Sequence, residues 1–154
     1  RGCHLISEQG IVAALSRLRR LQALELNQWS NMSEASVELL VRHCVAARRL
    51  DLSMCERIGD GVLAKAARAL TQLRDLECYG AMRLQRVQLK SPSLASLSLS
   101  NCRSLSDLAL SCPNLTRLSM QNCREISAEA VMLLGTSCPS LEFLDLSGCS
   151  RLGS

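Results

Sequence analysis

Cysteine is the residue type with the most chemical potential in this chain, which has nine cysteines and two histidines. Thiolates and imidazoles are common zinc ligands, and together they form the nucleophile–base pairs of thiol enzymes. The cysteine count is odd, and no two cysteines have CxxC spacing. His4 and His43 neither repeat nor belong to a metal-ligand motif. We therefore expect no catalytic residues, no metal ion and no cofactor.

Most of the cysteines instead recur at fixed places in an internal repeat. One set follows the apolar core of a repeat, namely Cys55, Cys102, Cys123 and Cys149. A second set stands three residues before the next repeat, namely Cys44, Cys112 and Cys138. A small side chain with a weak S–H donor fits an inward-facing turn and can reach a neighbouring backbone carbonyl. We therefore interpret both sets as structural.

The repeat itself has the pattern L-x-x-L-x-L-x-x-C-x-x-[IL], with copies starting at residues 21, 47, 73, 94, 115 and 141. Its fourth and sixth positions are two residues apart, so in a strand both side chains point to the same, inward face. Each copy can bury that face only against its neighbours. The pattern predicts an α/β leucine-rich-repeat solenoid, a horseshoe arc with a parallel concave sheet. Its strands are expected at 23–27, 49–53, 75–79, 96–100, 117–121 and 143–147.

The repeats have two lengths, because successive copies start 26, 26, 21, 21 and 26 residues apart. The 26-residue units have room for convex helices, which we expect over Glu34–Cys44, Asp60–Leu70 and Ala128–Ser137. Ser33 and Ser127 stand where a helix N-cap belongs. The 21-residue units have no such room. Their apolar rhythm predicts short convex strands over 85–89 and 106–110, which would place Arg86 beside Asp107 on the solvent side.

The ends of the chain fall within repeats. Cys3, Ile6 and Ser7 have the spacing of Cys123, Ile126 and Ser127, so residues 1–20 match the second half of a unit. Residues 141–154 match the first half of another. We expect residues 1–154 to form one leucine-rich-repeat domain that is incomplete at both ends and belongs to a longer chain.

The bulk composition excludes several classes of partner. Lysine and arginine number 18 against 14 acidic residues, without a block of five like charges, so we expect no nucleic-acid partner. No apolar run reaches the length of about 18 residues that a membrane span needs. The cysteine usage favours thiols kept reduced, in the cytoplasm or the nucleus.

Three segments carry a family resemblance: LDLSMCERIGDGVL, LSMQNCREISAEAV and LEFLDLSGCSRL. They resemble the cysteine-containing leucine-rich repeats. The alternation in SPSLASLSLSNCRSLSDLALSCPNLTRLSMQNC is similar to plant and green-algal F-box/leucine-rich-repeat proteins. This resemblance implies the substrate-recognition subunit of a Skp1–cullin–F-box ubiquitin ligase. The chain contains no F-box-like segment, so contact with the Skp1–cullin machinery would need a part that is not in this sequence.

The concave face is the surface on which we expect a protein partner, because the third, fifth and seventh positions of each repeat point outward there. The candidate residues are Glu25, Arg49, Asp51, Asp75, Glu77, Tyr79, Arg117, Gln121, Phe143 and Asp145. Carboxylates aligned on adjacent strands repel one another, and a basic partner would relieve that repulsion. An acidic row is also explained as repeat consensus. Two roles stay open: an adaptor for ubiquitination, and a scaffold subunit of a larger assembly.

Overall fold

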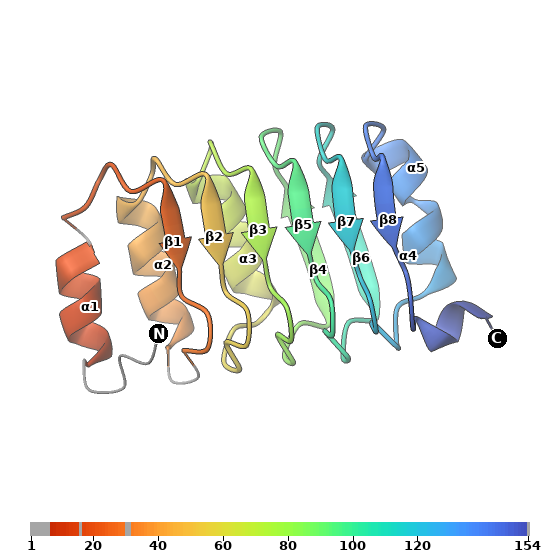
Figure 1. Ribbon diagram of the computed structural model, residues 1–154, viewed down its shortest axis with the longest axis horizontal. Helices are drawn as coiled ribbons and strands as arrows, with labels where there is room; N and C mark the ends of the chain where they lie inside the picture. Colours follow the sequence, from red (N-terminus) through yellow and green to blue (C-terminus); the bar gives the residue numbers. More distant parts are fainter. Residues whose placement is uncertain (1–6, 16, 30–31, 154) are drawn as a thin grey trace.

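The front layer of the molecule is a six-stranded parallel sheet with the strand order β1-β2-β3-β5-β7-β8. This is a computed structural model, and it describes residues 7–15, 17–29 and 32–153. The strands are Ala23–Glu25 (β1), Arg49–Asp51 (β2), Asp75–Glu77 (β3), Ser96–Ser98 (β5), Arg117–Ser119 (β7) and Phe143–Asp145 (β8). Figure 1 shows them side by side in chain order, with helices α2 to α5 and strands β4 and β6 behind them. The predicted α/β class with a parallel sheet is confirmed.

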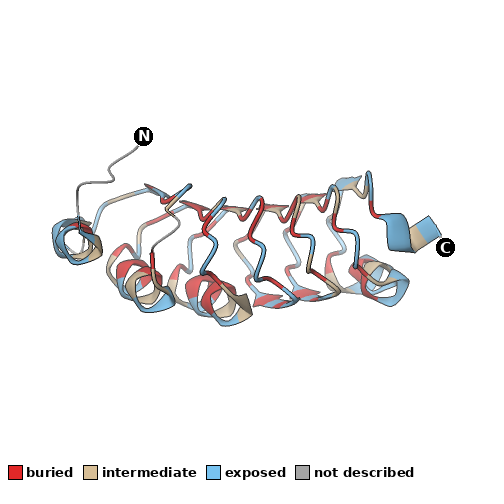
Figure 2. Ribbon diagram, turned by 90° about the horizontal axis from the view of Figure 1, so that it is seen from below, coloured by how far each residue is buried: buried red, intermediate tan, exposed pale blue. Residues whose placement is uncertain are grey.

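The second layer contains the segments that return the chain from one strand to the next. Its helices are Glu8–Leu15 (α1), Glu34–His43 (α2), Asp60–Ala69 (α3), Ala128–Met132 (α4) and Leu134–Ser137 (α5). Arg86–Lys90 (β4) and Asp107–Ser111 (β6) pair as a two-stranded parallel sheet, and a 3₁₀ turn, Ser150–Gly153 (η1), follows β8. Figure 2 shows the buried residues facing the space between the two layers.

The core is a set of rows that run across the sheet. Leu24, Leu50, Leu76, Leu97 and Leu118 are partners in the strand register, and each is at most 3% exposed. The residues two positions later lie on the same inner face, as the two-residue period of a strand requires. A row of this kind exists only when coils stack, so every coil depends on its neighbours for its burial.

The strands are three residues long, whereas the repeat pattern predicted five. The chain leaves each of the six strands of the front sheet through a residue with positive φ three positions after the strand ends. These residues are Gln28, Met54, Gly80, Asn101, Asn122 and Gly148. A left-handed residue turns the chain back toward the core and ends the sheet pairing, and it is tolerated best by glycine and asparagine. The backbone requirement of this turn was not visible in the apolar pattern.

Helix starts follow the predicted capping. The Ser33 hydroxyl accepts from the amide N–H of Ser36, and the Ser127 hydroxyl accepts from that of Ala130. The predicted single helix over Ala128–Ser137 is wrong, because it divides at Leu133 into α4 and α5. The Leu133 carbonyl accepts both from the amide N–H of Ser137 over 3.1 Å and from its hydroxyl over 2.9 Å, so a side-chain bond is added to the helical one after this break.

Carboxylates at the first position of α1, α2 and α3 link each of these three coils to the next. The amide N–H of Ser33 donates to Glu8 Oε1 over 2.6 Å, and that of Gly59 donates to Glu34 Oε1 over 2.8 Å. In the following coil, the Asp60 carboxylate accepts from two backbone N–H groups at the start of β4. Arg86 and Asp107 are exposed register partners in β4 and β6. Of the predicted match at the start of the chain, Cys3 and Ile6 lie outside the described residues, as does His4, whereas the Ser7 hydroxyl accepts from the amide N–H of Gly10 over 3.2 Å.

The turn after β3 generates a stability prediction. Gly80 has φ +66°, so alanine there should lower the free energy of unfolding by about 1–2 kcal/mol, the cost of the left-handed conformation for a residue with a Cβ. The matched control is Gly61→Ala in α3, where an added Cβ meets no atom within 4 Å. That change should raise stability by about 0.5–1 kcal/mol. Urea unfolding followed by circular dichroism measures both, and equal stability of Gly80→Ala and the parent chain would contradict the turn geometry.

Candidate functional site

The thiols of the first cysteine set bind backbone carbonyls of the preceding coil. Cys55 Sγ donates to the Leu26 carbonyl over 3.1 Å, and Cys102 Sγ donates to the Cys78 carbonyl over 3.1 Å. Cys123 and Cys149 repeat this bond over 3.0 and 3.1 Å. Each accepting carbonyl belongs to the residue that directly follows a strand. The predicted thiol-to-carbonyl contact is therefore present in four coils, and the coil between those of Cys55 and Cys102 has Ala81 at this position.

These thiols are held in their protonated form. Burial raises the pKa of Cys55 and Cys102 to about 11 from an ordinary value of 9.0, and it raises the pKa of Cys123 to about 12. A protonated thiol is a hydrogen-bond donor, whereas nucleophilic attack and metal binding both need the thiolate. Within the described ranges, no group of three or more His, Cys, Asp or Glu side chains is placed to hold a metal ion. His43 Nδ1 lies 2.8 Å from the Leu39 carbonyl of its own helix.

The outer face of the sheet brings the predicted binding residues into two separate groups. The first spans β1 to β3 and the turn after β3, and it contains Glu25, Arg49, Asp51, Asp75, Glu77 and Tyr79. The second spans β7, β8 and the turn after β7, and it contains Arg117, Gln121, Phe143 and Asp145. Strand β5, with Ser96 and Ser98, lies between them. They do not form one continuous site.

Asp51 was predicted to be an exposed carboxylate on the binding face, and this prediction is wrong, because its side chain makes hydrogen bonds within the protein. The residue is 7% exposed. Its Oδ2 accepts from the Asn27 side-chain amide over 2.9 Å, and its Oδ1 accepts from the amide N–H of Ser53 over 2.9 Å. Both carboxylate oxygens are therefore occupied by donors of its own and the preceding coil, and Asp51 does not offer a free charge to a partner.

Arg49 reduces the repulsion that the acidic row was expected to carry. Its Nε lies 3.8 Å from Glu25 Oε1 and its Nη2 lies 3.4 Å from Glu77 Oε1. The three side chains are between 40% and 60% exposed, so solvent screens both ion pairs and each contributes only about 0–1 kcal/mol. The β1–β3 group is thus a solvated acidic cluster with one arginine at its centre, and it is net negative because Glu25, Asp75 and Glu77 outnumber Arg49.

An exposed apolar pair borders this cluster at the end of the strands. Tyr79 is 44% exposed and Met54 is 45% exposed. The amide N–H of Met54 donates to the Tyr79 carbonyl over 2.7 Å, so the two residues are direct neighbours. Sequence reasoning missed Met54. The available signal was its position, which requires a left-handed residue and which Gln28, Gly80 and Asn101 fill with less apolar types.

The second group is organised by an aromatic contact. The Arg117 guanidinium carbon lies 4.6 Å from the centroid of the Phe143 ring, within the range of a cation–π interaction. Hydrogen bonds from the Ser147 side chain and amide N–H lower the pKa of Asp145. Gln121 is exposed. Arg117 is partly engaged by the ring, so this group offers less free charge than the β1–β3 group.

The stacked coils, the leucine rows and the parallel sheet together define a leucine-rich-repeat domain. Residues 10–153 match the family described as At1g61320/AtMIF1, LRR domain, and the chain belongs to that family. The chain is also 31% identical over 114 residues to the Antagonist of mitotic exit network protein 1 of Eremothecium gossypii. That match covers 69% of this chain, which spans about 29% of the length of the curated relative. A domain of this class indicates protein–protein interaction.

No helix in the described part of the chain is both long enough and apolar enough to cross a membrane.

The thiol ladder generates a prediction about pH. The folded-state pKa values of Cys55 and Cys102 are about 11, above the ordinary 9.0, so the unfolded chain releases these protons first as the pH rises. Their contribution to stability is complete below pH 9 and should be lost between pH 9 and pH 11. Cys55→Ser with Cys102→Ser keeps a donor at each position but removes this titration. Urea unfolding at pH 8 and pH 10.5 should therefore show a steeper loss in the parent chain, and equal slopes would contradict the raised pKa values.

Proposed function

We propose that this domain captures a protein partner on the outer face of its sheet, which is the concave face of a leucine-rich-repeat horseshoe. The observation that carries the proposal is the cluster of carboxylates formed by exposed Glu25 and half-exposed Asp75 and Glu77, beside exposed Tyr79 and Met54. An exposed aromatic and a flexible methionine among charged residues have the composition of a binding hot spot. The neighbouring serines of β5 offer neither charge nor apolar area.

The chemistry of the cluster favours a basic or mixed-charge partner segment. Asp75 makes no ion pair among the described residues, and Glu77 shares Arg49 with Glu25. A lysine or arginine of the partner can pair with Asp75 and Glu77, and an acidic group of the partner can use Arg49. Such complementarity raises the association rate and the selectivity more than the affinity. The apolar contact would come from Tyr79 and Met54.

At the level of the whole protein, we propose the substrate-recognition repeat region of an F-box/leucine-rich-repeat subunit of an SCF-type ubiquitin ligase, acting in the cytoplasm or the nucleus. The support is the resemblance of the short repeats to F-box/leucine-rich-repeat proteins. A relative that is named as an antagonist of the mitotic exit network fits a protein that acts by binding another. The competing role is a structural scaffold subunit.

The sheet-face proposal predicts the effect of a charge reversal. Once a partner has been identified with the full-length protein, Asp75→Lys with Glu77→Lys should slow its association by about tenfold at low salt and weaken the salt dependence of the rate. Tyr79→Ala should instead mainly raise the dissociation rate, because it removes a desolvated contact. Asp51 is left unchanged, because its carboxylate is hydrogen-bonded within the protein and its substitution would change stability as well as surface charge. Stopped-flow or surface-plasmon measurements give both rates.

The matched control for this reversal changes the same charge elsewhere. Glu129→Lys with Glu142→Lys replaces two exposed carboxylates of α4 and the edge before β8. This variant should leave the association rate within about twofold of the parent. An equal effect of the two double variants would show that net charge, not the cluster, controls binding and would remove the proposal.

The adaptor proposal predicts a composition for the purified full-length protein. It should co-purify with a Skp1-type protein in equal amounts through its F-box, and mass spectrometry of the native complex measures that ratio. Recovery in fixed stoichiometry within a large assembly that contains no Skp1-type protein would favour the scaffold role instead.

A further inference from the structure

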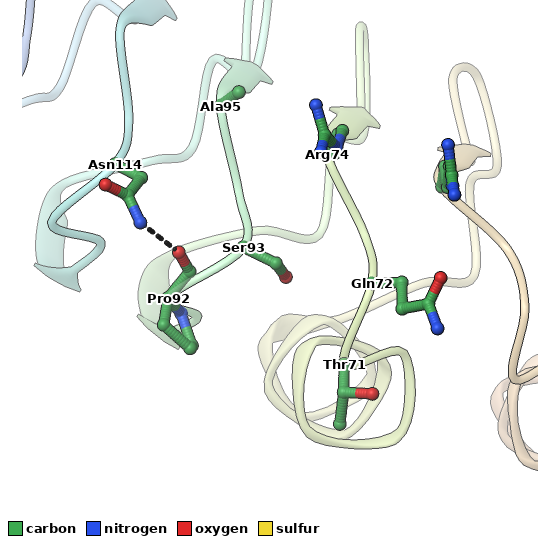
Figure 3. A pocket seen from close by; sticks show the side chains of 8 residues that line it. Thr71, Gln72, Arg74, Pro92, Ser93, Ala95 and Asn114 are labelled. Atoms are coloured by element: carbon green, nitrogen blue, oxygen red, sulfur yellow. Dashed lines mark hydrogen bonds between the residues drawn. The ribbon is translucent and has the colours of Figure 1, made fainter.

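A pocket opens at the edge of the sheet where the strands begin, and it is lined by different residues from those of the β1–β3 cluster. Its volume is about 510 Å³. Thr71 and Gln72 line it from the loop after α3, and Pro92 and Ser93 line it from the loop after β4. Figure 3 shows these two loops beside each other, with Arg74 on the strand side. The volume lies within the range of small-ligand sites, roughly 300–1,000 Å³.

The pocket stands where the two kinds of coil meet. The coil before it returns through helix α3, and the coil after it returns through strand β4. Packed helices are separated by roughly 10 Å and paired strands by roughly 4.8 Å. The loop after α3 and the loop after β4 therefore start from elements that are spaced differently in the second layer. Successive coils of one kind lack this mismatch. The strand pairs Arg49–Asp75 and Asp75–Ser96 show that the coil length changes here from 26 to 21 residues. We attribute the pocket to this change in coil length.

Two arginines give the pocket its charge. Arg48 and Arg74 occupy the same position in successive coils, directly before β2 and β3, and the Arg74 amide N–H donates to the Arg48 carbonyl over 2.8 Å. Both side chains are exposed, and no carboxylate lines the pocket. Among the described residues neither guanidinium takes part in an ion pair, whereas the adjacent Arg49 has two acidic partners.

Three backbone carbonyls of the pocket lining are already occupied by donors of the protein. The carbonyl of Arg48 and that of Arg74 each accept from two backbone N–H groups of the next strand. The Pro92 carbonyl accepts from the Asn114 side-chain amide over 2.7 Å, the bond drawn in Figure 3. These backbone acceptors are therefore engaged. The two guanidinium groups are the charged donors of the lining, whereas the hydroxyl and amide side chains of the two loops can both donate and accept.

We propose that this pocket binds a phosphate monoester carried on a side chain of a partner peptide. A carboxylate has two oxygens and one charge, which a single guanidinium satisfies. A phosphate monoester has three terminal oxygens and nearly two charges, so it can engage Arg48 and Arg74 together. Arginine clusters recognise phosphorylated segments in this way. The remaining volume accommodates the peptide atoms on either side of the phosphorylated residue.

The test compares three probes by NMR titration of the intact chain at constant ionic strength. They are a capped pentapeptide of alanines around one phosphoserine, the same peptide with serine, and inorganic phosphate. The phosphopeptide should bind at least about tenfold more tightly than either of the others. Inorganic phosphate that binds as tightly as the phosphopeptide would overturn the assignment to a peptide. Absence of phosphopeptide binding would overturn the site.

Two pairs of variants separate the pocket from general charge. Arg48→Ala with Arg74→Ala should weaken phosphopeptide binding about tenfold. Arg103→Ala with Arg124→Ala removes two exposed arginines from equivalent positions of neighbouring coils at the opposite edge, and it should change binding less than about twofold. An equal loss in both double variants would assign binding to net charge and overturn the proposal.

The second pair blocks the pocket without removing an arginine. Ala95 occupies the position equivalent to Arg48, Arg74 and Glu142, so this place in a coil accepts long side chains. Ala95→Glu puts a carboxylate beside Arg74 and should abolish phosphopeptide binding, whereas Ala95→Gln, of the same shape, should retain more of it. Equal affinities of the Glu and Gln variants would contradict the site. None of these changes touches Asp75, Glu77 or Tyr79, so failure here leaves the sheet-face proposal to its own test.

Discussion

Hydrogen bonding between successive coils is the constraint on which the rest of this structure depends. A three-residue strand cannot satisfy its own backbone, so its N–H and C=O groups must meet those of the neighbouring coil. Past the strand, the carbonyl of Leu26 or Leu99 is buried, and a cysteine of the next coil donates to it. Behind the strand, carboxylates such as Asp60 accept backbone N–H groups of the following coil. Each coil is completed by another, which keeps the register the same from β1 to β8.

A constant register turns sequence positions into surface rows. The fifth position of each coil forms one row across the sheet and the third forms another, so Arg49 meets Glu25 and Glu77 although they lie 24 and 28 residues away. A binding site on such a surface is therefore recognised by comparing the same position in successive coils, and not by a local sequence motif. The pocket also follows from the constant register. Two coils of different length pair through their strands in the front layer, but one returns through helix α3 and the other through strand β4 in the second layer.

Identical side chains acquire different roles from small differences in their surroundings. Asp51 and Asp75 both lie on the outer sheet face. Asn27 and the Ser53 amide occupy the Asp51 carboxylate, whereas Asp75 is half-exposed and has no ion-pair partner in the part of the chain that the structure describes. In the same part of the chain Arg49 is paired, and Arg48 beside it is not. For this reason the acidic row on the sheet is a weaker source of repulsion than its composition indicates, and the free charges lie at Asp75 and at the pocket edge.

The sequence alone determined the α/β class, the parallel sheet, the strand positions to within two residues and the caps at Ser33 and Ser127, because each depends on local spacing that a repeat displays several times over. The inward thiols of Cys55 and Cys102 were also predictable, since burial and a weak donor leave a turn carbonyl as the partner. Strand length, the break at Leu133 and the burial of Asp51 were decided by tertiary structure. So was the pocket beside Arg74. The physical reason is that these features depend on which groups of the next coil are within hydrogen-bonding distance, and a one-dimensional pattern does not contain that distance.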